Sequence, residues 1–199
     1  QDSDNGMYDA IRKVFDRYIT HCEWMGWINC DDYLTPNCFY DLRTIDKHSE
    51  VKFVVARRSI KHESGEFITC AQEISTSSVS SGIHDGIYAN YVQQEGAFFR
   101  HNLWSDFKYK DTFASCKLAG DWFLWMHLAK SAQIYENIRS MAIFCQHVGQ
   151  LSENLESYQN EINNLLAREK RREFREKLST LVSNKFIVKR EKIYFLNHK

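Results

Sequence analysis

Side chains that could do chemistry lie at three separate points of the chain. Asp31 and Asp32 follow the apolar stretch CEWMGWI after two intervening residues, Asp121 lies between two aromatic-rich stretches, and His147 precedes a long amphipathic segment. Adjacent carboxylates repel each other, and both stay ionised at low cost only where a cation or hydrogen-bond donors lie nearby. The acidic doublet therefore either caps the element that follows it or holds a positive group, such as a hard divalent ion.

Each of these groups also has a structural interpretation, which residue type alone favours. An acidic pair after a strand is usually a turn or a helix N-cap. An acid in the first turn of a helix, such as Asp121, normally interacts with the helix dipole, although an apolar environment can raise its pKa and make it a general base. A lone histidine such as His147 is more often structural than a ligand.

Composition excludes several classes of protein. The chain has 199 residues, of which 43% are hydrophobic, enough for one well-filled core with an appended helix. The 26 basic residues equal the 26 acidic ones, so no net charge favours nucleic acid as a partner. No apolar run approaches the roughly 20 residues of a membrane span. The chain begins with Gln1, which suggests a piece of a longer protein.

Motifs exclude further classes. The six cysteines form no C-x-x-C pair, which argues against a zinc site and a disulfide framework and predicts free thiols in a reducing compartment. The sequence contains no G-x-x-x-x-G-K-[ST], G-x-G-x-x-G, H-E-x-x-H or G-x-S-x-G. Phosphate-loop nucleotidases, Rossmann dehydrogenases, zincins and α/β-hydrolases therefore lose their main support.

The first third of the chain alternates helical and strand patterns. Helix 4–19 is predicted to begin at Asp4 or Asn5, and residues 23–28 form a buried strand. Thr35 and Pro36 mark the start of a helix through residues 37–48, and residues 51–57 form the next strand. This order favours an α/β layered sheet, in which ligands bind beyond the carboxyl ends of the strands. The helical spacing of the first segment is given by Met7, Ile11, Phe15 and Tyr18.

The rest of the chain predicts one mobile loop and two further helices. The serine-rich segment 70–90 is expected to be a mobile surface loop near a cleft, and residues 118–133 a helix with Asp121 in its opening turn. Residues 151–165 form a long amphipathic helix. Segment 168–177, with six basic and three acidic residues, is a solvated helix face that leaves room for a weak membrane-surface contact. The last segment, 185–196, fits a strand or a short helix.

Five segments, taken in order, resemble the family 2 glycosyltransferases of the GT-A fold. They are DNGMYDAI, GWINCDD, VQQEGAFFRHNLW, LAGDWFLW, and HVGQLS with YQNEI. The resemblance covers about residues 2–163 and implies an α/β, GT-A-like mixed sheet flanked by helices, with a C-terminal amphipathic helix. It divides the chain into residues 1–163, the C-terminal part of a GT-A domain, and a basic helical tail at 164–199.

The resemblance implies a donor side that holds a nucleotide-diphospho-sugar through Mn²⁺ or Mg²⁺. Asp32 would bind the divalent ion and Asp31 the ion or the ribose of the donor. Asn29 takes a place often held by an acid, and His147 matches a histidine that approaches the diphosphate or the metal. Asp4 belongs to the first matching segment and is placed with the donor. A bound cation stabilises the leaving diphosphate by several kcal/mol.

On the acceptor side, Asp121 matches the catalytic aspartate, which would take a proton from an acceptor hydroxyl in an inverting displacement. Gln94 and Glu95 match the acceptor-side loop. Gly120 departs from the family pattern, because an acid frequently precedes the aspartate. Arg12 and Val14 also depart from it, where the family often has Asn and Gly, and the arginine commonly found before the histidine is missing.

The family's strand-helix-strand unit for the nucleobase precedes the region matched. This predicts that the chain alone binds nucleotide-sugar poorly and leaves a central strand edge uncovered. The implied role is cytoplasmic synthesis of surface polysaccharide or lipid-linked glycan, peripheral at the inner membrane face, with a glycan or lipid-linked acceptor. The alternatives are a non-catalytic glycan-binding or assembly module on the same fold and, from the tail alone, a helical interaction protein.

Overall fold

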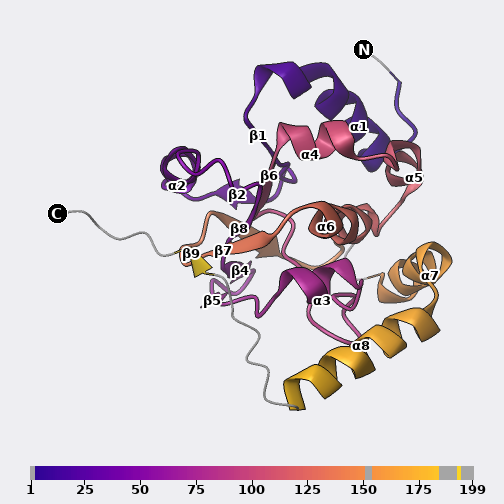
Figure 1. Cartoon of the computed structure of the whole chain (residues 1–199). Helices are drawn as coiled ribbons and strands as arrows, with labels where there is room; N and C mark the ends of the chain where they lie inside the picture. The colour runs from indigo at the N-terminus through magenta and orange to yellow at the C-terminus, as the bar shows by residue number, and fades with distance from the viewer. Residues whose placement is uncertain (1–2, 151–153, 184–191, 194–199) are drawn as a thin grey trace.

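A computed structural model describes residues 3–150, 154–183 and 192–193. The chain is a mixed α/β protein in which helices flank two mixed sheets, as the sequence predicts (Figure 1). The helices are α1 (Met7–Tyr18), the 3-10 helix η1 (Ile19–His21), α2 (Cys38–Ile45), α3 (Thr76–Ser80), α4 (His101–Asp106), α5 (Lys110–Ser115), α6 (Gly120–Ser131), α7 (Leu155–Leu165) and α8 (Arg168–Ser183).

The strands form two sheets. The larger has the order β1-β6-β3-β7-β9, and β3 lies between antiparallel β6 and parallel β7. The smaller has the order β2-β8-β4-β5. The strands are β1 (Trp24–Met25), β2 (Tyr33–Leu34), β3 (Phe53–Val55), β4 (Arg58–His62), β5 (Phe67–Cys70), β6 (Ala97–Arg100), β7 (Ile134–Asn137), β8 (Ala142–Gln146) and β9 (Lys192–Ile193).

The strand predicted at 51–57 is confirmed over Phe53–Val55, which pair with β6 and β7 and are fully buried. The strand predicted at 23–28 is shorter than expected. Only Trp24 and Met25 pair with β6, and the chain then leaves the ladder at Gly26, where a Cβ would lie 2.8 Å from the Phe98 ring. Within the described residues, β1 has β6 as its one strand partner and so forms an edge of the larger sheet.

Helix α6 is the centre of the core and confirms the helix predicted at 118–133. The side chains expected on one apolar face, such as Trp122 and Trp125, are buried, but so are those between them, so the core surrounds this helix on several sides. Trp125 stacks on Trp27 with ring centroids 5.2 Å apart. This stack ties the segment before the acidic doublet to the helix that carries Asp121. The additional buried side chains are Phe123, Leu124, Met126 and Leu128.

Helix α1 is confirmed, but its predicted cap and apolar face are partly wrong. Its N-cap is Gly6, with no side-chain cap, because Asp4 accepts a hydrogen bond from the Gly6 N–H (3.1 Å) before the helix begins. Met7 and Tyr18 are 40% and 52% exposed, whereas Tyr8 is buried. Tyr8 takes the inward position because its ring packs edge-to-face on Phe113 of α5, at 5.2 Å.

The helix predicted to start at Thr35 and Pro36 begins later, at Cys38, with Asn37 as its N-cap. The Thr35 hydroxyl donates instead to the carbonyl of Ser140, at 3.0 Å, which ties this turn to the strand β8 region. The proline therefore precedes the helix rather than opening it.

The prediction of a mobile loop at 70–90 is wrong. Ser75 caps α3 through a capping box with Ser78, and α3 packs against α6. His84 and Asp85, which follow the helix, are also buried. Ser75 and Ser78, which indicated a flexible loop, instead cap the helix. Serine is common both in loops and at helix N-caps, so residue type alone does not distinguish the two.

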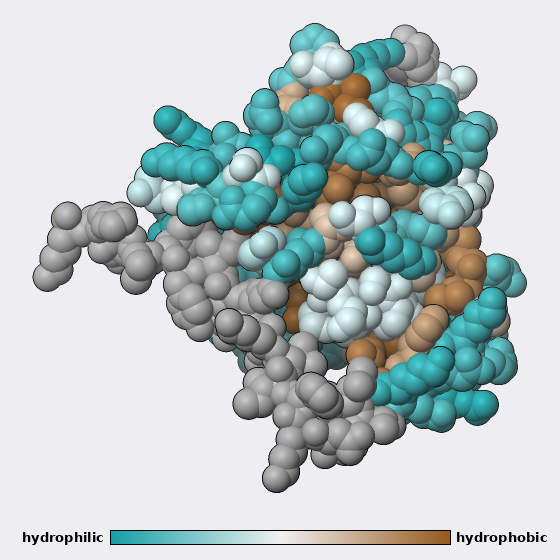
Figure 2. All heavy atoms as spheres, viewed as in Figure 1, coloured by the Kyte–Doolittle hydropathy of each residue, from teal (hydrophilic) through white to brown (hydrophobic). Residues whose placement is uncertain are grey.

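The amphipathic helix predicted at 151–165 is confirmed over α7, although Leu151 lies outside the described residues and Leu155 is 55% exposed. The basic segment forms a separate helix, α8, whose visible surface is hydrophilic (Figure 2). The prediction that α8 is only a solvated face is wrong at Arg171, whose side chain is fully buried. Of the segment 185–196, the structure describes only the short strand β9. No helix in the described part of the chain is both long and apolar enough to span a bilayer.

Candidate functional site

A cleft of about 430 Å³ brings together side chains from distant parts of the chain. They come from the segment after β1, the loop before β6, the start of α6 and the segment after β8. The basic side chains that line it are Lys117 and His147. Of the residues predicted from sequence, the cleft is lined by Asn29, Asp31, Gln94, Glu95, Asp121 and His147.

Asp31 is the acid of the doublet that faces this cleft. Its Oδ2 lies 3.0 Å from Nε2 of His147 and accepts a hydrogen bond from Nε2 of Gln150 at 3.2 Å. These contacts lower the pKa of Asp31, that of His147 coming first. The pKa of His147 is raised by its contact with the Val148 carbonyl and then by Asp31. About a third of the Asp31 side chain remains exposed (35%), so it is open to solvent from the cleft.

Asp32 is half-buried behind its neighbour. Its Oδ1 accepts a hydrogen bond from the backbone N–H of Cys145 at 2.8 Å, and its Oδ2 accepts one from Nδ2 of Asn29 at 3.2 Å. Burial, and then the charge of Asp31, raise its pKa. Asp32 therefore joins the end of β8 to the segment after β1. Its ionised form is destabilised by burial and by the neighbouring charge of Asp31.

Glu95 and Gln94 lie between the doublet and Asp121. The Gln94 amide donates to the Trp27 carbonyl, and its Oε1 lies 3.5 Å from Nδ2 of Asn29. Glu95 is 5% exposed, and burial, followed by the charges of Asp32 and Asp121, raises its pKa to about 8. Glu95 is therefore largely protonated at neutral pH.

Asp121 lies in the first turn of α6, as predicted, and burial raises its pKa to about 6. The Tyr8 hydroxyl lies 3.4 Å from its Oδ1 and donates to the carbonyl of Leu118 at 2.9 Å. A Cβ on Gly120 would lie 2.6 Å from the Tyr8 ring, so a larger residue requires that ring to move. Gly120 thus makes room for the tyrosine that contacts Asp121.

A second cleft, of about 330 Å³, lies against the same wall. Its other lining residues include Arg58, Tyr91 and Gln146. The wall that both clefts share is formed by Gln94, Glu95, Asp121, Phe144 and Tyr158. Asp121 and Glu95 therefore face two adjoining spaces.

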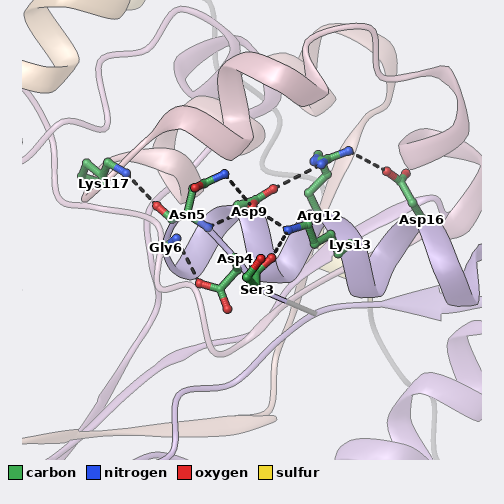
Figure 3. Close-up of polar contacts among 9 residues, drawn as sticks. All are labelled: Ser3, Asp4, Asn5, Gly6, Asp9, Arg12, Lys13, Asp16 and Lys117. Atoms are coloured by element: carbon green, nitrogen blue, oxygen red, sulfur yellow. Dashed lines mark hydrogen bonds and ion pairs between the residues drawn. The ribbon is translucent and has the colours of Figure 1, made fainter. Parts of the chain in front are cut away.

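Two predicted site residues, Asp4 and Asp32, line neither cleft; Asp32 lies behind Asp31, whereas Asp4 precedes α1. The Asp4 carboxylate is held at the start of α1 by the Gly6 N–H, in an exposed cluster of polar contacts (Figure 3). Arg12 also lies in this cluster, where it forms ion pairs with Asp9 (3.2 Å) and Asp16 (3.6 Å) along the helix. Val14 is 53% exposed.

Sequence reasoning missed four residues of the site: Tyr8, Lys117, Gln150 and Tyr158. Gln150 precedes α7, whose N-cap is Asn154, and its side-chain amide donates a hydrogen bond to Asp31. Tyr8 lies one position from the predicted apolar face. Tyr158 was predicted as a core residue of an amphipathic helix, and its role in two clefts depends on packing that no local pattern encodes.

The donor set suits a divalent ion that is shared with a phosphate-bearing ligand. In residues 3–150 and 154–183, no three His, Cys, Asp or Glu side chains gather as a self-contained metal site. Mg²⁺ bound together with substrate phosphates commonly uses one or two protein carboxylates and several waters. Asp31 supplies one carboxylate of this kind on the cleft, with Asp32 half-buried directly behind it, so the residues fit such an ion. All six cysteines are free thiols, as predicted.

Comparison with known proteins leaves the family open. No model of a known protein family matches the sequence, and no curated protein matches it significantly.

Proposed function

We propose that the chain is part of a metal-dependent glycosyltransferase that moves a sugar from a nucleotide-diphospho-sugar to an acceptor hydroxyl with inversion. One observation carries the proposal. Asp121, a carboxylate with a pKa raised to about 6, stands on the wall between two adjoining clefts, and one of these clefts also contains Asp31 and His147. A two-substrate transfer needs a base at such a boundary.

The 430 Å³ cleft is the proposed donor side. Asp31 and Asp32 would hold Mn²⁺ or Mg²⁺, which neutralises charge on the departing diphosphate when bound. Lys117 supplies positive charge on the same cleft for phosphate oxygens, and His147 lines this cleft beside Asp31. Asn29 keeps Asp32 oriented through its 3.2 Å hydrogen bond.

The 330 Å³ cleft is the proposed acceptor side, for a glycan or lipid-linked acceptor. The acceptor oxygen forms a bond to the anomeric carbon while the bond from that carbon to the diphosphate oxygen breaks. The hydroxyl proton passes to the Asp121 carboxylate, and the diphosphate leaves with the electron pair. Because one displacement occurs, the anomeric configuration inverts. A base with a pKa near 6 is mostly ionised at pH 7 and still accepts a proton efficiently.

In the same proposal the protein works in the cytoplasm, where it uses nucleotide-sugars. The exposed basic side chains of α8 would make a weak contact with the inner face of the membrane. Residues Arg172 and Arg175 lie on this helix, although Glu169, Glu173 and Glu176 offset part of their charge.

A second candidate function, a non-catalytic glycan-binding or assembly module, has its own support. The carboxylates of the doublet already have hydrogen-bond donors within the protein, from His147 and Gln150 to Asp31 and from Cys145 to Asp32. A doublet stabilised in this way can be structural without a cation.

Turnover separates the two functions. The full-length protein that contains this sequence is incubated with Mn²⁺ and a panel of nucleotide-sugars, and release of nucleoside diphosphate is followed with and without chelator. We expect turnover that Asp121→Asn reduces by about 10²–10⁴-fold. Asp106→Asn, at the exposed end of α4, is the matched control and leaves the rate unchanged.

The metal assignment has its own variant. Asp31→Asn is expected to raise the Mn²⁺ concentration needed for half-maximal turnover, because it removes the doublet carboxylate that faces the cleft. A response to Mn²⁺ identical to that of the wild type would remove Asp31 from the metal site. Absence of turnover with every donor, together with retained glycan binding, would favour the module.

A further inference from the structure

A buried ion pair joins the C-terminal helix to the body of the protein. Nε of Arg171, in α8, lies 2.9 Å from Oδ2 of Asp85, and both side chains are fully buried. The remaining guanidinium contacts are also within the protein, since Nη2 donates to Oδ1 of Asn163 at 2.9 Å and Nη1 donates to the carbonyl of Leu166. Leaving either buried charge without its partner is costly in free energy. Removal of Arg171 is therefore expected to destabilise the surroundings of Asp85.

Asp85 in turn organises the segment 82–91. Its Oδ1 accepts hydrogen bonds from the backbone N–H groups of Ile87 (2.8 Å) and Tyr88 (2.9 Å). Gln159 of α7 donates to its backbone carbonyl, and Arg175 of α8 lies over the Tyr88 ring, 5.5 Å from its centroid. Both C-terminal helices therefore hold this segment.

The same segment ends at the second cleft. Tyr91 packs edge-to-face on Tyr158 of α7, with ring centroids 5.1 Å apart, and both rings line the 330 Å³ cleft. The Tyr91 carbonyl accepts a hydrogen bond from Arg58, another lining residue. Arg171 thus holds Asp85, and the chain leads from Asp85 through Tyr88 to Tyr91 in the aromatic wall of the cleft.

We infer that Arg171 is a positioning residue for the acceptor: through Asp85 it fixes Tyr91 and Tyr158 as an aromatic wall, which takes the apolar face of an acceptor sugar ring. The side-chain amides of Gln94 and Gln146 line the same cleft and supply hydrogen bonds for sugar hydroxyls. The assignment of this cleft to the acceptor rests on the proposed function, whereas the link from Arg171 to the aromatic wall does not. Tyr91 lines this cleft and not the donor cleft, whereas Tyr158 lines both, so the tail acts on the acceptor more than on the donor.

The test compares Arg171→Met with Arg172→Met in the full-length protein. Arg172 is the matched control because it neighbours Arg171 in α8 and its side chain is 63% exposed. Hydrogen exchange followed by mass spectrometry should be faster in segment 82–91 of Arg171→Met and unchanged in Arg172→Met. With p-nitrophenyl β-glycosides as acceptors, KM should rise about tenfold or more in Arg171→Met, the scale that misplacement of a positioning group produces. Donor hydrolysis without acceptor should change less than the acceptor KM, because Tyr91 does not line the donor cleft, a split that general destabilisation would not produce.

A second variant covers the case in which Arg171→Met does not fold. Arg171→Lys keeps the positive charge but loses the guanidinium fork, so we expect the same changes at smaller size. Unchanged exchange in segment 82–91, or an unchanged acceptor KM in a variant whose exchange is faster, overturns the inference.

If the wild type releases no nucleoside diphosphate from any donor, it is the proposed function that fails. The inference is then judged by direct binding of the same glycosides. Weaker binding to Arg171→Met than to the wild type supports it, and equal binding to both, or no binding to the wild type, overturns it.

Discussion

Acidic side chains in two regions of the molecule have pKa values shifted in opposite directions. At the start of α1, Asp9 accepts hydrogen bonds from Lys13 (2.9 Å) and Asn5 (3.0 Å) and contacts Arg12 (3.2 Å), and these partners lower its pKa to about 2 (Figure 3). In the clefts, burial raises the pKa of Glu95 to about 8 and that of Asp121 to about 6. The α1 acids have matched cations, whereas neighbouring acids add to the shift at Glu95.

This difference shows where the fold carries an electrostatic cost. Acids paired along one helix contribute to stability, whereas desolvated acids that face one another reduce it unless a proton or a cation is bound. Perturbed carboxylates that converge on a cleft are a mark of functional sites. The comparison therefore supports the cleft, and not the more numerous surface ion pairs, as the place of chemistry.

The largest expected effect is on the pH dependence of turnover. Asp121 must be ionised to act as a base, so kcat/KM should rise with pH and level off above about pH 6, falling roughly tenfold per unit below that value. The measurement is kcat/KM from pH 4.5 to 8 at saturating Mn²⁺. A profile that is flat through pH 6 would show that Asp121 is not the base.

The second effect concerns the stability of the cleft. The folded state keeps a proton on Glu95 that the unfolded chain loses from about pH 4.5 upward, so this residue lowers the stability progressively as pH rises toward 8. We expect Glu95→Gln, which is neutral at every pH, to weaken this decline, measured as the free energy of unfolding at pH 5 and pH 8 in chelator. The size is bounded by roughly 1.4 kcal/mol per unit of pKa shift. Equal pH dependence in both proteins would mean that Glu95 is ionised in the fold.

The third effect is steric. Gly120→Ala places a Cβ 2.6 Å from the Tyr8 ring, and overpacking of this kind typically costs about 1–3 kcal/mol of unfolding free energy. Because the clash is with one ring, the same substitution should cost clearly less in a Tyr8→Ala background. Urea unfolding of the single and double variants measures both. Additive costs would place the strain elsewhere than at this ring.

The sequence predicted those features that local patterns encode. The central strand β3, helix α6 and the position of Asp121 in its first turn follow from apolar runs and helix-start signals. The meeting of Asp31, Glu95 and Asp121 was expected from a family resemblance, because no local rule brings residues so far apart in the chain to one cleft.

The failures have a shared cause in tertiary packing. The serines of segment 70–90 suit a loop and a helix cap equally, and the burial of Val79 and Asp85 decides between them. Arg171 was expected to be solvated because its neighbours are charged, but Asp85, 86 residues away, compensates it in the interior. Local polarity does not report such distant partners.

The smallest effect belongs to the surface region and has the opposite sign with pH. Because the pKa of Asp9 is lowered in the folded state, ionised Asp9 stabilises the protein at pH values above its ordinary pKa of 3.8. This contribution is lost as the pH falls through about 2. Asp9→Asn should therefore lower the melting temperature slightly at pH 7, and the gap from the wild type should close in acid. Salt should also narrow it at pH 7, because the side chains of Arg12 and Lys13 are partly exposed and such pairs are screened. The Glu95→Gln variant should instead gain stability relative to the wild type as pH rises, because the wild-type Glu95 carboxyl is buried without a cationic partner among the causes of its pKa shift. If both variants showed the same pH trend, net charge rather than local pairing would govern the two regions, and the contrast between them would not hold.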